Sequence, residues 1–140
     1  NGVLKGYSIS VNEFDIAKQF KIDYNYSVSN KTYPSYEYVK PSLSSNYNKA
    51  LLKIKGNLVL GNVKITGVNN LYDLIYNFGK LKYVIDGKTY IQNVDFKEIK
   101  PKKTNQENTY YIETLESVIN AQNVSLVFKV RGENFEFVLK

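Results

Sequence analysis

The clearest pattern of apolar and polar positions starts near residue 70. Asn69 or Asn70 can cap a helix, and Asp73 falls in the first turn, where the helix dipole favours a carboxylate. The residues that follow the i, i+3, i+4, i+7 spacing of one apolar stripe are Leu71, Leu74, Ile75 and Phe78. The pattern predicts one short amphipathic helix over about residues 70–79, ended by Gly79 in a left-handed cap.

Alternating apolar and polar positions predict strands along most of the remaining chain. After the helix, residues 81–85 and 89–99 alternate around Asp86-Gly87, a pair that readily takes the positive backbone angles of a tight hairpin turn, and Pro101 ends the second strand. A second hairpin is predicted near the C-terminus, with strands over 124–130 and 135–139 and a turn over 131–134. Further strands are expected over 7–11, 21–28, 50–55, 57–60 and 63–67, where the Gly-Asn pairs 56–57 and 61–62 read as tight turns or bulges.

Several segments are less regular. Residues 16–20 fit either a strand or a helical turn, and residues 110–119 are expected to run from a strand into a short turn of helix. A turn is expected at 29–31, and Pro34 limits any strand after it to a short one at a sheet edge. Residues 41–48 and 102–108 are expected to be loops.

These elements define the predicted fold class. At least four alternating segments against one helix indicate an α+β protein that is mainly β, with an antiparallel sheet or a sandwich or barrel. A length of 140 residues fits a single domain, 1–140. Residues 13–41 and 71–101 share several landmarks in the same order, which indicates either an internal duplication or chance similarity in a chain rich in Lys, Tyr and Asn.

Composition narrows the chemistry. The chain has no cysteine and no histidine, which excludes disulfides, thiolate ligands and the commonest general base. The spacing of the carboxylates selects no catalytic pair, and Glu113 and Glu116 are expected on a solvated face. We therefore expect no enzyme activity, no catalytic or metal-binding residues and no cofactor. No apolar run is long enough to span a membrane, and the start at Asn1 leaves removal of an export signal open.

The net charge is +6 and the isoelectric point is about 9.3, which would suit an anionic partner. Lysine supplies nearly all of the positive charge, a pattern more typical of a compositional bias than of a designed basic surface. The dense basic cluster consists of Lys100, Lys102 and Lys103. Together with exposed aromatic rings, such a cluster could hold single-stranded nucleic acid, which we regard as a minority alternative.

Tyrosine is the unusual residue, with 13 in the chain. Amphipathic aromatic rings bury much area at low entropic cost, so they favour protein and sugar interfaces. The candidate partner-binding residues, which lie in one Tyr-, Ser- and Pro-rich stretch, are Tyr33, Tyr36, Tyr38 and Tyr47. The alternative is that these tyrosines only cover a β surface or belong to the core.

The opening Asn1-Gly2-Val3 and the strand over 7–11, together with the helix and hairpin over 71–99, resemble bacteriophage tail structural proteins of the tail-tube and baseplate type. The resemblance implies a non-enzymatic virion protein that forms a homo-oligomer or larger assembly through sheet edges and loops. It transfers no functional residue. A secreted or cell-surface binding module for a protein or glycan would have the same composition, so both settings are expected ahead of the cytoplasm.

Overall fold

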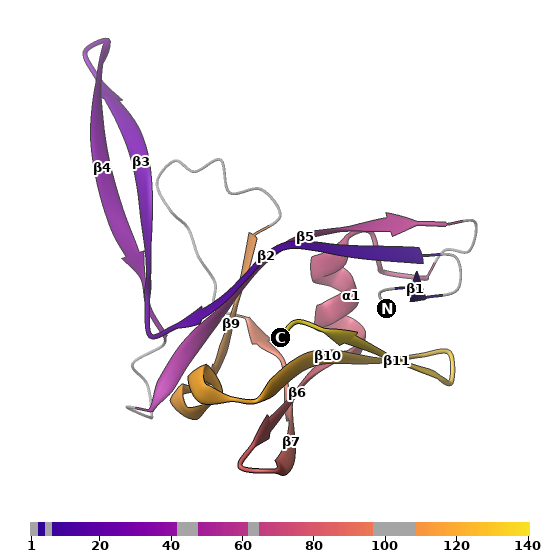
Figure 1. Ribbon diagram of the computed structural model, residues 1–140. Helices are drawn as coiled ribbons and strands as arrows, with labels where there is room; N and C mark the ends of the chain where they lie inside the picture. Colours follow the sequence, from indigo (N-terminus) through magenta and orange to yellow (C-terminus); the bar gives the residue numbers. More distant parts are fainter. Residues whose placement is uncertain (1–2, 5–6, 42–47, 62–64, 97–108) are drawn as a thin grey trace.

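The computed structural model describes residues 3–4, 7–41, 48–61, 65–96 and 109–140. Within these ranges the chain forms three antiparallel sheets, one α-helix and a short 3-10 helix (Figure 1). The predicted class, α+β and mainly β, is confirmed, and none of the three sheets closes into a barrel. Neither described helix has the length or the apolar character needed to cross a membrane.

The first sheet has the strand order β1-β2-β5-β9-β8. Its strands are β1 (Val3–Leu4), β2 (Tyr7–Ala17), β5 (Lys49–Leu60), β9 (Thr109–Leu115) and β8 (Asp95–Phe96). The predicted short strands over 50–55 and 57–60 are one continuous strand, because the bulge lies in the neighbouring β2, between Val11 and Glu13. A side chain at Gly56 would overlap the carbonyl oxygen of Ser10, so glycine is required here for close strand approach.

The second sheet has the strand order β11-β10-β6-β7. Its strands are β6 (Gly79–Ile85), β7 (Lys88–Asn93), β10 (Asn123–Val130) and β11 (Glu133–Val138). Both predicted hairpins are confirmed, with turns at Asp86-Gly87 and Arg131-Gly132 whose residues all have positive φ. The second turn is shorter than the predicted 131–134, because Glu133 and Asn134 already belong to β11. The predicted run from strand into helical turn over 110–119 is also confirmed, as β9 followed by the 3-10 helix η1 (Glu116–Asn120).

The main core lies between the two larger sheets, with the helix α1 (Leu71–Phe78) placed between them (Figure 1). The predicted N-cap is confirmed, because the side chain of Asn70 accepts a 2.8 Å hydrogen bond from the backbone N–H of Asp73. The side chains of this core that are less than 2% exposed are Leu52, Ile54, Leu71, Leu74, Ile75, Leu81, Ile112, Val118, Val124 and Leu126.

Three predictions about the ends or type of an element were wrong. Gly79 has φ −94° and ψ 150°, so it is not a left-handed cap but the first residue of β6; an added Cβ would lie 2.7 Å from the carbonyl oxygen of Ile75. The strand expected over 89–99 ends at Asn93, and the chain then joins the first sheet through β8. Residues 65–67 form a turn rather than a strand. Residues 62–64 and 97–108, the second of which includes Pro101, lie outside the described residues.

Candidate functional site

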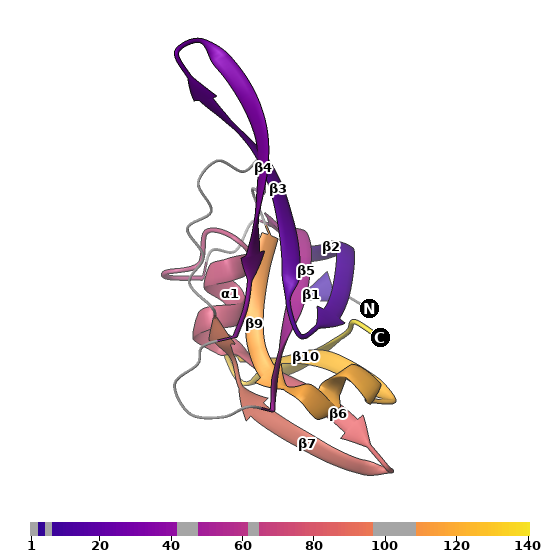
Figure 2. The same cartoon turned by 90° about the vertical axis from the view of Figure 1, so that its left-hand side faces the viewer.

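The third sheet is a hairpin of β3 (Phe20–Val28) and β4 (Lys31–Val39), which we call the arm. Two views at right angles show it standing clear of the rest of the molecule (Figures 1 and 2). The expected turn is confirmed at Ser29-Asn30, with φ values of 51° and 66°. Two successive positive φ values match the twist of a two-residue hairpin, so local sequence specifies the register of the arm.

The sequence prediction of a short edge strand after residue 31 was half right. In the described part of the chain β4 pairs only with β3, so it is an edge strand. It is not short, however, but nine residues long, as long as β3. Pro34 does not interrupt it, because the backbone nitrogen at this position points away from β3 and the missing N–H costs no hydrogen bond within the arm. The ambiguous residues 16–20 are not helical: β2 runs to Ala17 and β3 starts at Phe20.

Tyrosines lie on both faces of the arm. Tyr33 is opposite Tyr26, and their rings stack with centroids 5.5 Å apart. On the other face Tyr36 and Tyr38 meet edge to face at 5.6 Å, and the Nζ of Lys21 lies 4.7 Å from the centroid of the Tyr36 ring. Such cation–π and aromatic pairs hold the rings in defined positions while they remain in water.

Three of the four candidate tyrosines therefore come together on the arm. Tyr33, Tyr36 and Tyr38 are 41%, 55% and 47% exposed, so they are surface residues and not part of the core. Tyr47 lies outside the described residues, as do Lys100, Lys102 and Lys103. The arm therefore presents a Tyr-rich surface in the described part of the chain.

The base of the arm is fixed to the first sheet by a second, smaller core. Its buried members are Ile22, Val39, Leu51 and Tyr111, with Phe20 packed against them. The rings of Phe20 and Tyr111 are 5.7 Å apart. Desolvation in this cluster, with a smaller effect of the Glu13 charge, raises the pKa of Tyr111 to about 12. The base of the arm is therefore packed against the first sheet through apolar side chains.

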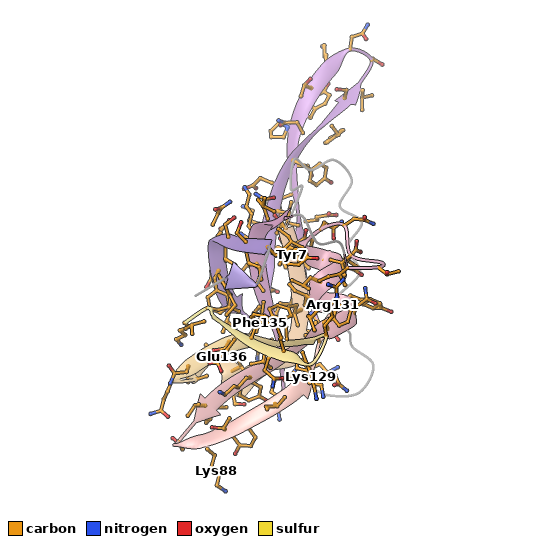
Figure 3. All side chains as sticks on the ribbon, turned by 90° about the vertical axis from the view of Figure 1, so that its right-hand side faces the viewer. Tyr7, Lys88, Lys129, Arg131, Phe135 and Glu136 are labelled. Carbon is orange, nitrogen blue, oxygen red and sulfur yellow. The ribbon has the colours of Figure 1, made fainter. Side chains whose placement is uncertain are left out.

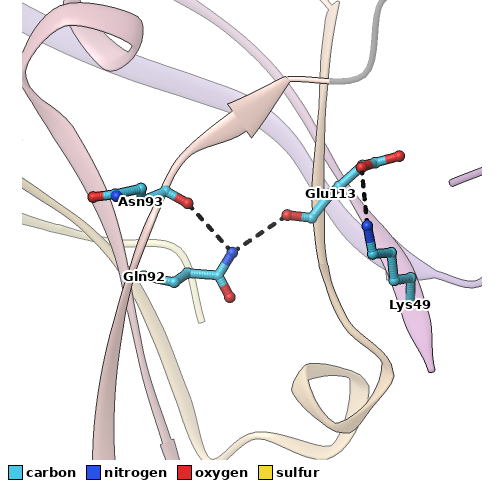
Figure 4. Close-up of polar contacts among 4 residues, drawn as sticks. All are labelled: Lys49, Gln92, Asn93 and Glu113. Carbon is cyan, nitrogen blue, oxygen red and sulfur yellow. Dashed lines mark hydrogen bonds and ion pairs between the residues drawn. The ribbon is translucent and has the colours of Figure 1, made fainter. Parts of the chain in front are cut away.

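A pocket of about 450 Å³ lies where the chain passes from β7 to β8 beside β9. Figure 4 shows the polar contacts among four residues that line it. Gln92 Nε2 donates to the backbone oxygens of Glu113 at 3.3 Å and Asn93 at 3.5 Å, and Lys49 Nζ is 3.6 Å from Glu113 Oε2. Thr114 Oγ1 donates to Gln92 Oε1 at 3.1 Å. The expectation of a solvated Glu113 was wrong, because this residue is only 7% exposed.

The groups of this pocket bond mainly to one another and tie the end of the second sheet to β9. Among the described side chains that line the pocket, Glu113 is the one carboxylate, and its Oε2 lies 3.6 Å from Lys49 Nζ. No local sequence pattern predicts this arrangement, because Gln92 and Glu113 are far apart in the chain.

Sequence reasoning also missed a tyrosine cluster on the body of the protein. Tyr72 and Tyr76 stack on the outer face of α1 with centroids 6.0 Å apart, and Tyr110 of β9 lies 5.7 Å from Tyr72. The i, i+4 spacing of the two helix tyrosines could have predicted the first pair. This cluster provides a comparison surface for experiments on the arm.

No protein-family model, curated protein sequence or solved structure matches this chain.

Proposed function

We propose that this protein is a non-enzymatic assembly protein that docks to a protein partner through the arm. The observation that carries the proposal is the arm itself: a two-stranded hairpin that projects into solvent from a buried base and presents ordered tyrosines on both faces. A two-stranded sheet is of marginal stability on its own, so a long projecting one is costly unless it contacts something.

The chemistry of the arm favours a protein as partner. Residues 20–39 carry Lys21 and Lys31 against Asp23 and Glu37, so their formal net charge is 2 − 2 = 0. Ten of these twenty residues are Tyr, Ser or Asn, the types that give adaptable protein-binding surfaces. Nucleic-acid binding depends on an excess of basic groups along the contact, which the arm lacks.

The resemblance to bacteriophage tail structural proteins supports an assembly of many copies in a virion as the setting. A secreted or surface binding module could use the same arm for a protein or glycan ligand, but it would bind as a single unit. Sedimentation velocity of the purified protein over a wide concentration range separates the two. We expect concentration-dependent association, whereas a chain that stays monomeric throughout supports the binding module.

Substitution of the arm tyrosines tests the docking surface. Tyr36→Ala and Tyr38→Ala should each weaken association by about 1–2 kcal/mol, the usual cost of truncating an aromatic anchor. Because both rings are exposed, the unfolding midpoint should stay nearly constant. Tyr76→Ala is the matched control, since Tyr76 is 65% exposed but lies on α1. Loss of fold stability with unchanged association would place the docking surface elsewhere.

A further inference from the structure

The two strands of the arm differ in their outer edges. The turn at Ser29-Asn30 makes Val28 and Lys31 a hydrogen-bonded pair. Along the rest of the arm, non-hydrogen-bonded and hydrogen-bonded pairs of residues then alternate. The residues whose backbone N–H and C=O groups point outward from β3 are therefore Lys21, Asp23, Asn25 and Ser27. On β4 the corresponding residues are Thr32, Pro34, Tyr36 and Tyr38.

Pro34 interrupts the outer edge of β4. It has no N–H, so a strand added there would lose one hydrogen bond and meet a proline ring in the middle of the row. The outer edge of β3 keeps all four outward N–H groups, and in the described part of the chain it pairs with no other strand. One edge of the arm is thus protected against strand addition and the other is open to it.

We infer that the open edge of β3 pairs antiparallel with β3 of a second copy of this chain, which extends the arm into a four-stranded sheet. The inference rests on the proposed docking function and names its partner. A strand added beside β3 must continue the apolar face of Ile22, Tyr24 and Tyr26 and the polar face of Lys21 and Asp23. The strand β3 has this alternation itself.

Charge disfavours one of the neighbouring registers, and the length of the paired strand disfavours the other. With Tyr24 opposite Tyr24 of the second copy, Asp23 lies opposite Asn25 of the second copy and Lys21 opposite Ser27, so no like charges face each other. All four outward residues of each strand are then paired. A shift by two residues in one direction places Asp23 opposite Asp23, and a shift in the other direction places Lys21 opposite the turn residue Ser29. Directly opposed like charges are destabilising.

Cysteine cross-linking tests this register directly, because the chain has no cysteine of its own. In the selected register position 24 faces itself at a non-hydrogen-bonded pair, where the Cα–Cα distance of about 4.5 Å suits a disulfide. Under dilute oxidising conditions Tyr24→Cys should form a covalent dimer, while Ser35→Cys, at the position opposite Tyr24 on β4, should remain mostly monomeric. Equal rates of dimer formation for the two variants would overturn the inference.

Proline substitution tests the edge without a cross-link. Asn25→Pro removes an outward N–H from β3, and Thr32→Pro removes one from β4, so neither breaks a bond inside the arm. With far-UV circular dichroism confirming the fold, Asn25→Pro should weaken self-association by about tenfold or more and Thr32→Pro should leave it unchanged. If Asn25→Pro associates normally while Tyr36→Ala does not, the docking function stands and pairing through β3 is wrong. A wild-type protein that stays monomeric excludes the second copy as partner.

Discussion

The attachment of the arm can be measured by comparing Ile22→Ala with Val28→Ala. Both residues lie on β3 and point to the same face, but Ile22 is 1% exposed, at the base, and Val28 is 53% exposed, near the tip. Truncating a fully buried isoleucine costs roughly 2–5 kcal/mol, because the transfer free energy is lost and a cavity remains between Leu51 and Tyr111. Truncating an exposed valine should change stability by less than about 0.5 kcal/mol.

Urea denaturation followed by far-UV circular dichroism gives the first readout. With an m-value of about 2 kcal/mol/M, the Ile22→Ala midpoint should fall by at least about 1 M, and that of Val28→Ala should hardly move. Hydrogen exchange of the arm amides gives the second, since loss of the base should lower their protection specifically. Equal midpoints and equal exchange in the two variants would show that the arm is not anchored through Ile22.

Three further outcomes are expected. Leu74→Ala, at the centre of the main core, should cost roughly 2–5 kcal/mol in urea denaturation, and an unchanged midpoint would show that α1 is not packed there. Gly79→Ala should lower the midpoint because its Cβ would meet the carbonyl oxygen of Ile75 at 2.7 Å; a neutral result would refute this. The hydrogen bond from Lys82 lowers the pKa of Glu136 in the folded state. The ionised carboxylate therefore stabilises the fold at pH values above its ordinary pKa of 4.5, and this stabilisation is lost as the pH falls through the lower pKa of the folded state. Glu136→Gln should reduce the loss of unfolding free energy with falling pH in the acid range. The same pH dependence in Glu136→Gln and wild type would show that Glu136 does not contribute to it.

Elements with signals inside a short stretch of sequence were predictable. The helix α1 has a cap and an apolar period within ten residues, and the turns at Asp86-Gly87 and Arg131-Gly132 each carry a glycine, which takes positive φ without steric cost. The alternation of β3 also gave its two faces correctly. In each case the residues that decide the structure are neighbours in the chain, so tertiary context adds little.

Features that depend on distant parts of the chain were not predictable. Ile22 and Val28 have the same place in the alternation of β3, yet only Ile22 meets Leu51 and Tyr111. Periodicity defines a face but does not tell what covers it, so the projection of the arm had no sequence signal. The burial of Glu113 likewise depends on Lys49 and on the chain crossing between the sheets.

The tyrosines of the arm combine a structural role with an exposed surface, which decides which of them can report on docking. Tyr33 stacks on Tyr26 across the two strands near the turn, so its removal would loosen the arm as well as any interface. Tyr36 and Tyr38 contact each other along β4. The lysine over Tyr38 is Lys40, just after the end of β4, whereas the lysine over Tyr36 is Lys21 of β3, so Tyr36 also contacts the neighbouring strand. The opposite end of the molecule, marked by Lys88 in Figure 3, is remote from this surface. A loss of association with Tyr36→Ala or Tyr38→Ala, in an arm whose amides keep their protection, would therefore report contact with the partner rather than disorder of the arm.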